Sequence, residues 1–270
     1  MNAMETIRHR RSVRTFDGND LRGEDAKKII EYANTVTNPY DIPIKWKLLN
    51  VKEDGLTTPV IVGADTFIVG KIGAVPYAEE AFGFSFEKVL LYADSLNIGT
   101  TWIAGTMDRP AFEAAAGLEE GEIMPAVSPL GYPAKKMSIR EVAMRKGIKA
   151  DNRLKPNRLF FDETFETAFD MNGDPVISDL FEMIRWAPSA VNKQPWRIVK
   201  SGNDFHFYEK RDKGYINNKG FDLQKVDIGI AMSHFTLGIE EQGRNAELLL
   251  SNPGIQTPQD TFYVATYRLG

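Results

Sequence analysis

The first residues that could do chemistry lie near the start of the sequence, in Arg10-Arg11-Ser12-Val13-Arg14-Thr15-Phe16. Three guanidinium groups and a hydroxyl within five positions can neutralise and hydrogen-bond a phosphate. A charged segment of this kind is more often simply solvated. Here Val13 and Phe16 alternate with the polar residues, so we expect part of the segment to pack while its arginines point together.

The second candidate is the segment Pro188–Trp196, which reads PSAVNKQPW. Its two prolines restrict the backbone and remove hydrogen-bond donors, so the loop is stiff. Its Asn and Gln side chains each present a donor and an acceptor, which suits the edge of a heterocycle with mixed C=O and N–H groups. An ordinary helix-to-strand connection with a buried tryptophan is the alternative. The density of proline and amide residues favours a binding loop.

The third candidate, residues 96–105, reads LNIGTTWIAG. Small residues after a helix let a ligand approach the backbone closely. We expect Gly99 to end the preceding helix as its C-terminal cap, and a capped helix that enters a buried turn would give much the same string. Taken alone, this segment therefore indicates a ligand only weakly.

Helices and strands must position these three segments. Apolar residues at helical spacing predict four helices, and Asp174-Pro175 supplies a capping residue and a first-turn proline for the third of them. Runs of β-branched and aromatic residues between the helices predict strands. The four helices have apolar faces within 26–33, 86–96, 177–184 and 232–239, and the strands are expected at 46–51, 66–74, 196–201, 205–210 and 261–270.

The two parts of the sequence repeat one order of elements: a helix, an irregular turn with a tryptophan, a strand, a longer helix and a final strand. Residue identity between the copies is low, so chance agreement of two α+β segments is the alternative. We predict an α+β fold of two tandem half-repeats, with mixed or antiparallel sheets flanked by helices. The halves would span residues 1–134 and 173–270, joined by a basic connecting segment at 135–172.

Composition excludes several classes of protein. The net charge of −4 in 270 residues and the pI near 5.6 argue against a nucleic-acid binder, and no apolar run is long enough to cross a bilayer. Without cysteine the chain can form neither disulfides nor thiolate metal sites. Its three histidines lack metal-ligand spacing, so we expect no metal site. A cytoplasmic globular protein that acts on neither nucleic acid nor membranes is the expectation.

Taken together, the motifs RRSVRTF, PSAVNKQPW, LNIGTTWIAG and the later LGYP (130–133) resemble the FMN-dependent nitroreductase family. The LGYP string is followed by a basic linker and by Leu159-Phe160-Phe161, which is similar to the long single-chain form represented by a Thermotoga nitroreductase. The resemblance covers most of the chain.

This resemblance implies a bound FMN. In the family two subunits pair, the arginines and serine of one hold the flavin phosphate, and the PSxxN loop of the other reaches the ring. A basic residue after the LGYP strand also binds the phosphate, and the backbone of a turn lies near flavin N5. Carried over to this sequence, the cofactor-binding residues are Arg10, Arg11, Ser12, Arg14 and Arg153 for the phosphate, Ala104 and Gly105 near N5, and Pro188, Ser189, Ala190 and Asn192 at the ring.

The sequence departs from the family pattern in a consistent way. The loop expected in the first half, residues 34–40, lacks the Pro-Ser and Gln-Pro-Trp parts, and the second half has only Lys155–Phe161 in place of the arginine motif. We therefore expect the two halves to imitate the two subunits of a family dimer. The chain would act as a monomeric pseudo-dimer with one flavin, bound by the intact motif of each half.

The activity that the resemblance implies is an FMN-dependent NAD(P)H oxidoreductase. Hydride would pass through flavin N5 to a small organic acceptor by ping-pong kinetics, with no catalytic side chain and with Arg14 or Lys193 placed near N1 and O2. Loops at 73–83 and 214–220 would cover the ring. The alternatives are a flavin- or nucleotide-binding protein without turnover, and a relic of the fold that holds no cofactor.

Overall fold

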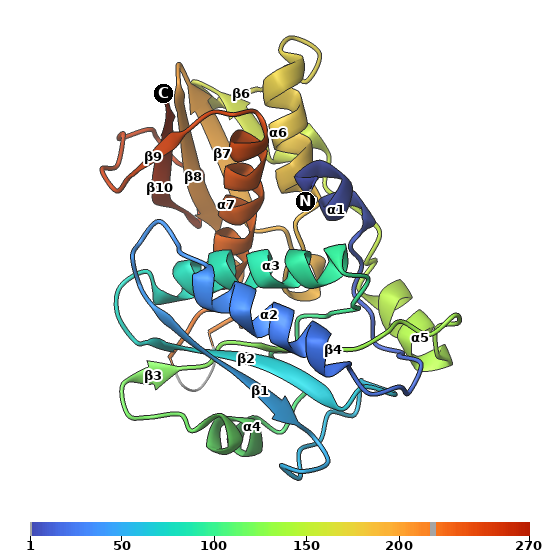
Figure 1. Ribbon diagram of the computed structural model, residues 1–270. Helices are drawn as coiled ribbons and strands as arrows, with labels where there is room; N and C mark the ends of the chain where they lie inside the picture. The colour runs from blue at the N-terminus through green and yellow to red at the C-terminus, as the bar shows by residue number, and fades with distance from the viewer. Residues whose placement is uncertain (1, 217–219) are drawn as a thin grey trace. The chain divides into compact units, whose positions relative to one another are not determined.

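The computed structural model describes residues 2–216 and 220–270, which form two compact units (Figure 1). Unit 1 comprises His9–Ala150, and unit 2 comprises Asn2–Arg8 with Asp151–Gly270. The helices are α1 Ala3–His9, α2 Gly23–Thr35, α3 Ala78–Ser95, α4 Arg109–Ala116, α5 Ile139–Gly147, α6 Pro175–Arg185 and α7 Leu223–Glu241, with short 3-10 helices η1 Pro156–Arg158 and η2 Ala190–Asn192. The strands are β1 Ile44–Asn50, β2 Thr66–Gly73, β3 Glu122–Ile123, β4 Val127–Leu130, β5 Phe160–Asp162, β6 Thr164–Ala168, β7 Trp196–Ser201, β8 Asp204–Lys210, β9 Ala246–Leu249 and β10 Thr261–Leu269.

The sheet of unit 1 is built around β2, which pairs antiparallel with β1, β3 and β4. Because side chains alternate between the faces of a strand, Trp46 and Leu49 of β1 point to opposite sides. Trp46 stacks on Phe86 of α3, with ring centroids 5.7 Å apart, while Leu49 belongs to an apolar cluster with Phe112 of α4. Helices α2 and α3 thus lie along one face of the sheet and α4 covers the other (Figure 1).

Unit 2 contains a sheet with strand order β6-β5-β7-β8-β10-β9. The β5–β7 pair is parallel, and the other pairs described for this sheet are antiparallel. Aromatic residues form the layer between sheet and helices: Phe160 stacks on Phe181 of α6 at 4.3 Å, and Phe205 lies 5.0 Å from Phe235 of α7. The core of this unit is therefore packed by rings rather than by aliphatic side chains alone.

Each unit repeats the expected order of elements. A helix (α2 or α6) precedes an antiparallel strand pair (β1–β2 or β7–β8), and then come a longer helix (α3 or α7) and a strand that pairs antiparallel with the second strand of the pair (β4 or β10). The α+β fold with mixed and antiparallel sheets flanked by helices is confirmed. The half-repeat boundaries and the pseudo-dimer stay predictions, and the segment 135–172 is divided, with α5 in unit 1 and β5 and β6 in unit 2.

The four predicted helices are present, and the capping role of Asp174 is confirmed, since its side chain accepts hydrogen bonds from the N–H groups of Val176 and Ile177. The prediction that Gly99 caps the second helix is wrong. Helix α3 already ends at Ser95, and the chain turns at Asn97, whose φ of 60° lies in the left-handed region. Asparagine tolerates that conformation, so no glycine is needed there.

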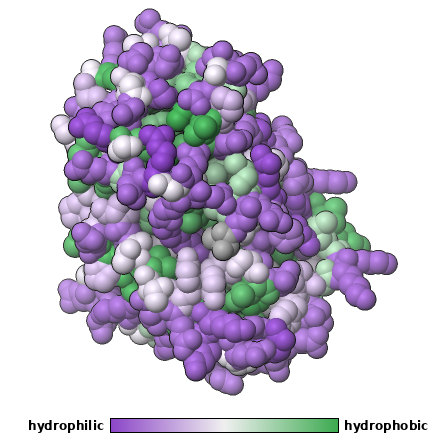
Figure 2. Space-filling model, turned by 45° about the horizontal axis from the view of Figure 1, so that its top comes forward, coloured by the Kyte–Doolittle hydropathy of each residue, from purple (hydrophilic) through white to green (hydrophobic). Residues whose placement is uncertain are grey.

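Apolar surface is limited on the face that Figure 2 shows, where hydrophobic residues form small separate groups among hydrophilic ones. Among the described residues, the most exposed large apolar side chain is that of Ile139 at the start of α5, which is 90% exposed. Within the described residues, no helix is both long and apolar enough to span a membrane.

Candidate functional site

In unit 1 the structure brings three separate sequence motifs together. The arginine motif lies beside the LNIGTTWIAG segment, where the N–H of Val13 donates to the carbonyl of Thr100 over 2.9 Å. That segment in turn meets the LGYP motif, since the N–H of Gly99 donates to the carbonyl of Gly131 over 2.7 Å. A Cβ at Gly99 would lie only 3.0 Å from the side chain of Val13, so a larger residue would force Val13 to shift.

The three arginines and the serine of the arginine motif differ in their surroundings. Arg10 is buried, and its Nε lies 3.6 Å from a carboxylate oxygen of Glu87. The Nη1 atoms of Arg10 and Arg14 are buried and have no hydrogen-bond partner among the described residues. Ser12 is half-buried and Arg11 is exposed. Val13 and Phe16 are each 4% exposed, which confirms the expected alternation of packed and polar residues.

Helix α5 adds a further cation to this region. Burial lowers the pKa of the Arg14 guanidinium, Glu141 raises it, and the charges of Arg145 and Arg10 lower it further. Thr15 fastens the helix to the motif by donating to Glu141 over 2.7 Å. Three guanidinium groups therefore gather in unit 1. Because the Nη1 atoms of Arg10 and Arg14 are costly to bury without partners, this cluster of positive charge fits an anionic group such as a phosphate.

Sequence reasoning missed Arg145. The helical character of residues 138–146 was visible, and Arg145 lies four residues after Glu141, so the two side chains share one face of the helix. Arg153, the residue that the sequence predicted for the phosphate after the LGYP strand, belongs to unit 2. Its guanidinium lies 5.1 Å from the ring centre of Trp186. Its Nη2 donates to the carbonyl of Trp186. A role of Arg153 toward a phosphate stays a prediction.

Two buried threonines continue the polar lining of unit 1. The hydroxyls of Thr100 and Thr101 have no hydrogen-bond partner among the described residues, although both side chains are almost fully buried. Thr100 pairs directly with Ser12 in a short parallel bridge. This stretch leads into the turn at Ala104 and Gly105, where Gly105 is exposed and a Cβ would meet no atom within 4 Å.

Arg109, at the start of α4, holds that turn. Its Nη2 donates to the carbonyls of Ala104 and Pro125 over 2.7 and 3.0 Å, and its Nη1 donates to the carbonyl of Met124 over 2.6 Å. Burial lowers the pKa of this guanidinium, while Glu113 raises it. No signal in the sequence singles out Arg109, because it differs from other arginines only in the carbonyls that the fold brings to it.

The proline-rich loop of unit 2 has an unusual backbone. Val191, Asn192 and Gln194 have φ angles of 50°, 58° and 52°, all in the left-handed region. Such angles are uncommon for residues other than glycine, and for a β-branched residue such as Val191 they carry real strain. Surrounding contacts must therefore hold the loop in this conformation.

The amide side chains of the loop provide part of that support. The Asn192 side chain donates to the carbonyl of Asn152 over 2.9 Å. The side-chain oxygen of Gln194 accepts from the backbone N–H of Leu154 over 2.9 Å. The backbone N–H of Gln194 donates to the hydroxyl oxygen of Ser189 over 2.9 Å. These contacts join the loop to the segment that precedes η1. Contacts of Pro188, Ser189, Ala190 and Asn192 with a flavin stay predictions.

A buried carboxylate on α7 supports the loop from the other side. Both oxygens of Asp227 lie 3.0 Å from the N–H of Ala190. Burial raises the pKa of Asp227 well above its ordinary value, the hydrogen bond from Ala190 lowers it, and Asp222 and Glu209 raise it. The backbone donor of Ala190 is thus already used within the protein. A lone aspartate in the apolar run VDIGIAM was the signal that could have identified this residue.

Cations near the loop have partners of their own. Lys193 pairs with Asp212 at 3.3 Å in a half-exposed ion pair. Arg197 donates to the carbonyls of Gln194 and Trp196, and its pKa falls to about 10, chiefly through burial and then through the charge of Arg158. The proposed role of Lys193 or Arg14 near flavin N1 stays a prediction. The predicted covering loop at 214–220 includes residues 217–219, which lie outside the described residues.

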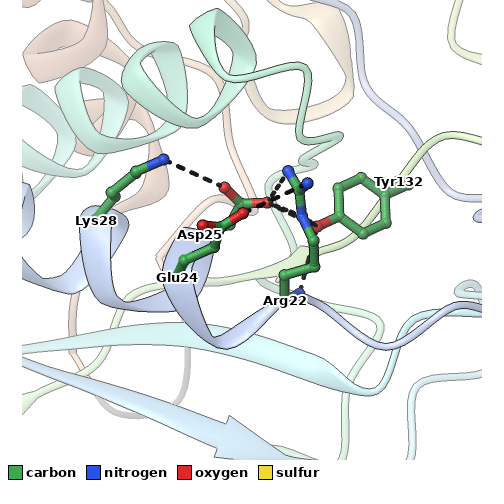
Figure 3. A network of polar contacts seen from close by, with 5 residues as sticks. All are labelled: Arg22, Glu24, Asp25, Lys28 and Tyr132. Carbon is green, nitrogen blue, oxygen red and sulfur yellow. Dashed lines mark hydrogen bonds and ion pairs between the residues drawn. The ribbon is translucent and has the colours of Figure 1, made fainter.

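The LGYP turn is fixed by a polar network at the start of α2 (Figure 3). The hydroxyl of Tyr132 donates to Asp25 over 2.7 Å, and Arg22 donates to the same carboxylate oxygen through Nε and Nη2. The hydrogen bond from Tyr132 is the first cause of the lowered pKa of Asp25. The network holds residues 131–133 where they border Phe16.

The segment 34–40 of unit 1, predicted to correspond to the binding loop, is organised around Asn38, which is 8% exposed. Its side-chain nitrogen donates to the carbonyl of Ile42, and its oxygen accepts from the N–H groups of Tyr40 and Ile42. Asn38 therefore closes its own loop.

Comparison with known proteins identifies the family and the fold of this chain. The family model described as "Putative TM nitroreductase" matches residues 2–239, so the chain belongs to this family. Among solved structures, a nitroreductase-type protein from Thermotoga maritima aligns over 100% of this chain and 93% of its own, with a TM-score of 0.62 and 22% identity. That likeness confirms the nitroreductase-like fold in its single-chain form.

Other solved structures align with about half of the chain. A Bacteroides thetaiotaomicron protein described as an NADH dehydrogenase/NAD(P)H nitroreductase covers 50% of this chain and 89% of its own, at a TM-score of 0.43 and 19% identity. An FMN-dependent nitroreductase from Clostridium difficile covers 52% and 94%, at a TM-score of 0.42 and 16% identity. No curated protein matches this sequence.

Proposed function

We propose that this chain is an FMN-dependent oxidoreductase that takes hydride from NAD(P)H and reduces a small organic acceptor. The observation that carries the proposal is the set of cations in unit 1. Arg10 and Arg14 have buried Nη1 atoms without partners among the described residues, and the charge of Arg145 reaches Arg14. In a chain of the nitroreductase family, such a set is suited to the terminal phosphate of FMN.

The residues of each unit have separate roles in this proposal. Arg10, Arg14 and Arg145 would neutralise the phosphate, and Ser12 would add a hydroxyl donor. The exposed backbone at Gly105 would lie near the reactive edge of the flavin. From unit 2, the Pro188–Asn192 loop would contact the ring, its strained backbone held in place by Asp227. Bound FMN supplies hydride acceptance from one substrate and hydride donation to the next.

The remaining parts of the proposal follow from one cofactor that serves two substrates in turn. NAD(P)H would bind, be oxidised and leave before the acceptor binds, which gives ping-pong kinetics. The acceptor gains a hydride and a proton, and the reductant leaves as NAD(P)⁺. We propose that the chain works in this way as a cytoplasmic monomer with one FMN.

The test is a visible spectrum of the purified protein with added FMN, before and after anaerobic addition of NADH or NADPH. The expected result is a bound flavin absorbance that is bleached by one of the nucleotides and returns when a quinone or nitroaromatic is added. A protein that binds FMN but is not bleached would be a flavin-binding protein without turnover. A protein with no affinity for FMN would contradict the whole proposal.

A further inference from the structure

Neither Ala104 nor Gly105 has a polar side chain, and Thr106 is the only polar residue between Ile103 and Asp108. The turn begins after Ile103, which exchanges two 2.9 Å backbone hydrogen bonds with Val127. It ends at Asp108, whose side chain caps α4. The backbone on either side of Gly105 would sample several conformations unless a contact from elsewhere fixed its peptide planes.

Arg109 provides such a contact on one particular peptide. The carbonyl that accepts from its Nη2 at 2.7 Å is that of Ala104. The same peptide unit carries the N–H of Gly105. Because a trans peptide is planar, its C=O and N–H point in opposite directions, and no cis peptide occurs in the described residues. A carbonyl held by Arg109 therefore aims the Gly105 N–H away from that guanidinium.

The charged guanidinium of Arg109 is itself held in place by other contacts. The guanidinium also binds the carbonyls of Met124 and Pro125, and its side chain is only 18% exposed, 3.6 Å from Glu113. Three carbonyls and a carboxylate therefore fix its plane. A cationic donor on a carbonyl polarises the whole amide, which makes the N–H of that amide a stronger donor.

We infer that Arg109 is a positioning residue that aims and strengthens the Gly105 N–H as a hydrogen-bond donor to the reactive nitrogen of the flavin. The inference rests on the proposed function for the identity of the ligand. It goes beyond that function by assigning to one side chain, which does not touch the cofactor, control over how readily the flavin accepts hydride.

The chain offers a control in a second buried cation that binds a backbone carbonyl. Lys71, which is also buried, donates through Nζ to the carbonyl of Gly117 at the other end of α4. The dipeptide Ala-Gly occurs in the sequence only at 104–105 and 116–117. Labelling alanine with carbon-13 at the carbonyl and glycine with nitrogen-15 therefore yields two amide signals, one from Gly105 and one from Gly117.

The experiment compares Arg109→Met with Lys71→Met. In the apoprotein, the Arg109→Met variant should move the Gly105 signal more than the Gly117 signal. The Lys71→Met variant should leave the Gly105 signal in place, because Lys71 binds the peptide that follows Gly117. With FMN bound, Arg109→Met should slow anaerobic flavin reduction by NAD(P)H roughly 10- to 100-fold, the range for loss of a charged hydrogen bond. Its affinity for FMN, and the reduction rate of Lys71→Met, should stay at the wild-type values.

The outcomes separate this inference from the proposed function. If the wild-type protein does not bind FMN or is not bleached, the proposed function fails, whatever the labelled signals show. If the wild-type protein is reduced but Arg109→Met leaves the Gly105 signal and the reduction rate unchanged, the role of Arg109 is wrong. An equal loss of FMN affinity and rate would also overturn it, because that points to general damage. Should Arg109→Met not fold, Arg109→Lys is measured in the same way, with a smaller loss expected.

Discussion

At the scale of single residues, burial distinguishes the arginines of unit 1. Arg10 pairs with Glu87, whose carboxylate also accepts from the indole N–H of Trp102 over 2.7 Å. Replacing Arg10 would leave that carboxylate buried with one partner fewer, so a loss of FMN binding in such a variant would be hard to separate from a loss of folding. Arg14 and Arg145 are better probes of the phosphate.

We expect Arg14→Met and Arg145→Met each to weaken FMN binding about 10- to 100-fold, because each removes a charged donor from the phosphate. Affinity for riboflavin, which lacks the phosphate, should hardly change. The control is Lys146→Met, which removes an exposed charge next to Arg145 on α5. Titration by flavin fluorescence measures all three variants, and equal losses for FMN and riboflavin would contradict a phosphate role.

The raised pKa of Asp227 predicts how the stability of the protein changes with pH. Burial raises its pKa in the folded state, so the folded protein holds a proton that the unfolded chain has already released. Stability must therefore fall as pH rises from the ordinary carboxyl pKa near 4 toward the raised value, with a slope of up to about 1.4 kcal/mol per pH unit. Asp227→Asn removes this titration, so urea unfolding of the variant should lack this fall. Parallel stability curves for the two proteins would contradict it.

At the scale of elements, the first turn of α2 and the LGYP turn depend on each other through Tyr132, Asp25 and Arg22 (Figure 3). Asp25 is 3% exposed, so its carboxylate needs these donors. The same LGYP segment borders the arginine motif, because the N–H of Asp17 donates to the carbonyl of Tyr132 over 2.9 Å. The network thus stabilises the backbone that carries the cations.

We expect Tyr132→Phe to lower the free energy of unfolding by about 1–2 kcal/mol, because a buried carboxylate loses a donor. Since the pKa of Asp25 is lowered in the fold, its contribution to stability is present above the ordinary carboxyl pKa and is lost as pH falls below it. The effect of the substitution should therefore shrink in acid. Tyr92→Phe, which keeps the stacking on Tyr32 at 4.1 Å, is the control and should be close to neutral in urea unfolding.

At the scale of the whole molecule, the intact motifs are divided between the units. The arginine motif, the Ala104–Gly105 turn and Arg145 belong to unit 1, and the Pro188–Trp196 loop belongs to unit 2. Asn38, which the predicted repeat aligns with Asn192, forms hydrogen bonds that close its own loop. A chain with one complete set of motifs should hold one flavin.

The corresponding prediction concerns stoichiometry. Equilibrium titration should give one FMN per chain in a monomer of about the sequence mass, 30.3 kDa. Arg14→Met in unit 1 and Asn192→Ala in unit 2 should each weaken this single binding event, whereas Asn38→Ala should lower stability by about 1–2 kcal/mol and leave FMN affinity unchanged. Two equivalents of FMN, or a variant that removes only half of the binding, would contradict the single-site proposal.

The sequence by itself determined the elements and the motifs of this protein. Helical spacing of apolar residues, the capping aspartate Asp174 and the β-branched runs are local signals, and local geometry is enough to interpret them. The alternation of Val13 and Phe16 with arginines likewise predicted a packed segment with clustered cations. The family resemblance, carried by four short strings, was confirmed by the match over residues 2–239.

Only the tertiary structure decided which polar groups support the motifs. Arg145, Arg109 and Asp227 were not identified from sequence, because each acts on backbone or charge that is distant along the chain or that is presented by a particular turn. The end of α3 at Ser95, before Gly99, was decided in the same way, since Gly99 instead packs closely on Val13 and hydrogen-bonds Gly131. Periodicity records which face of an element is buried. Contacts between distant segments depend on packing, which a local pattern does not encode.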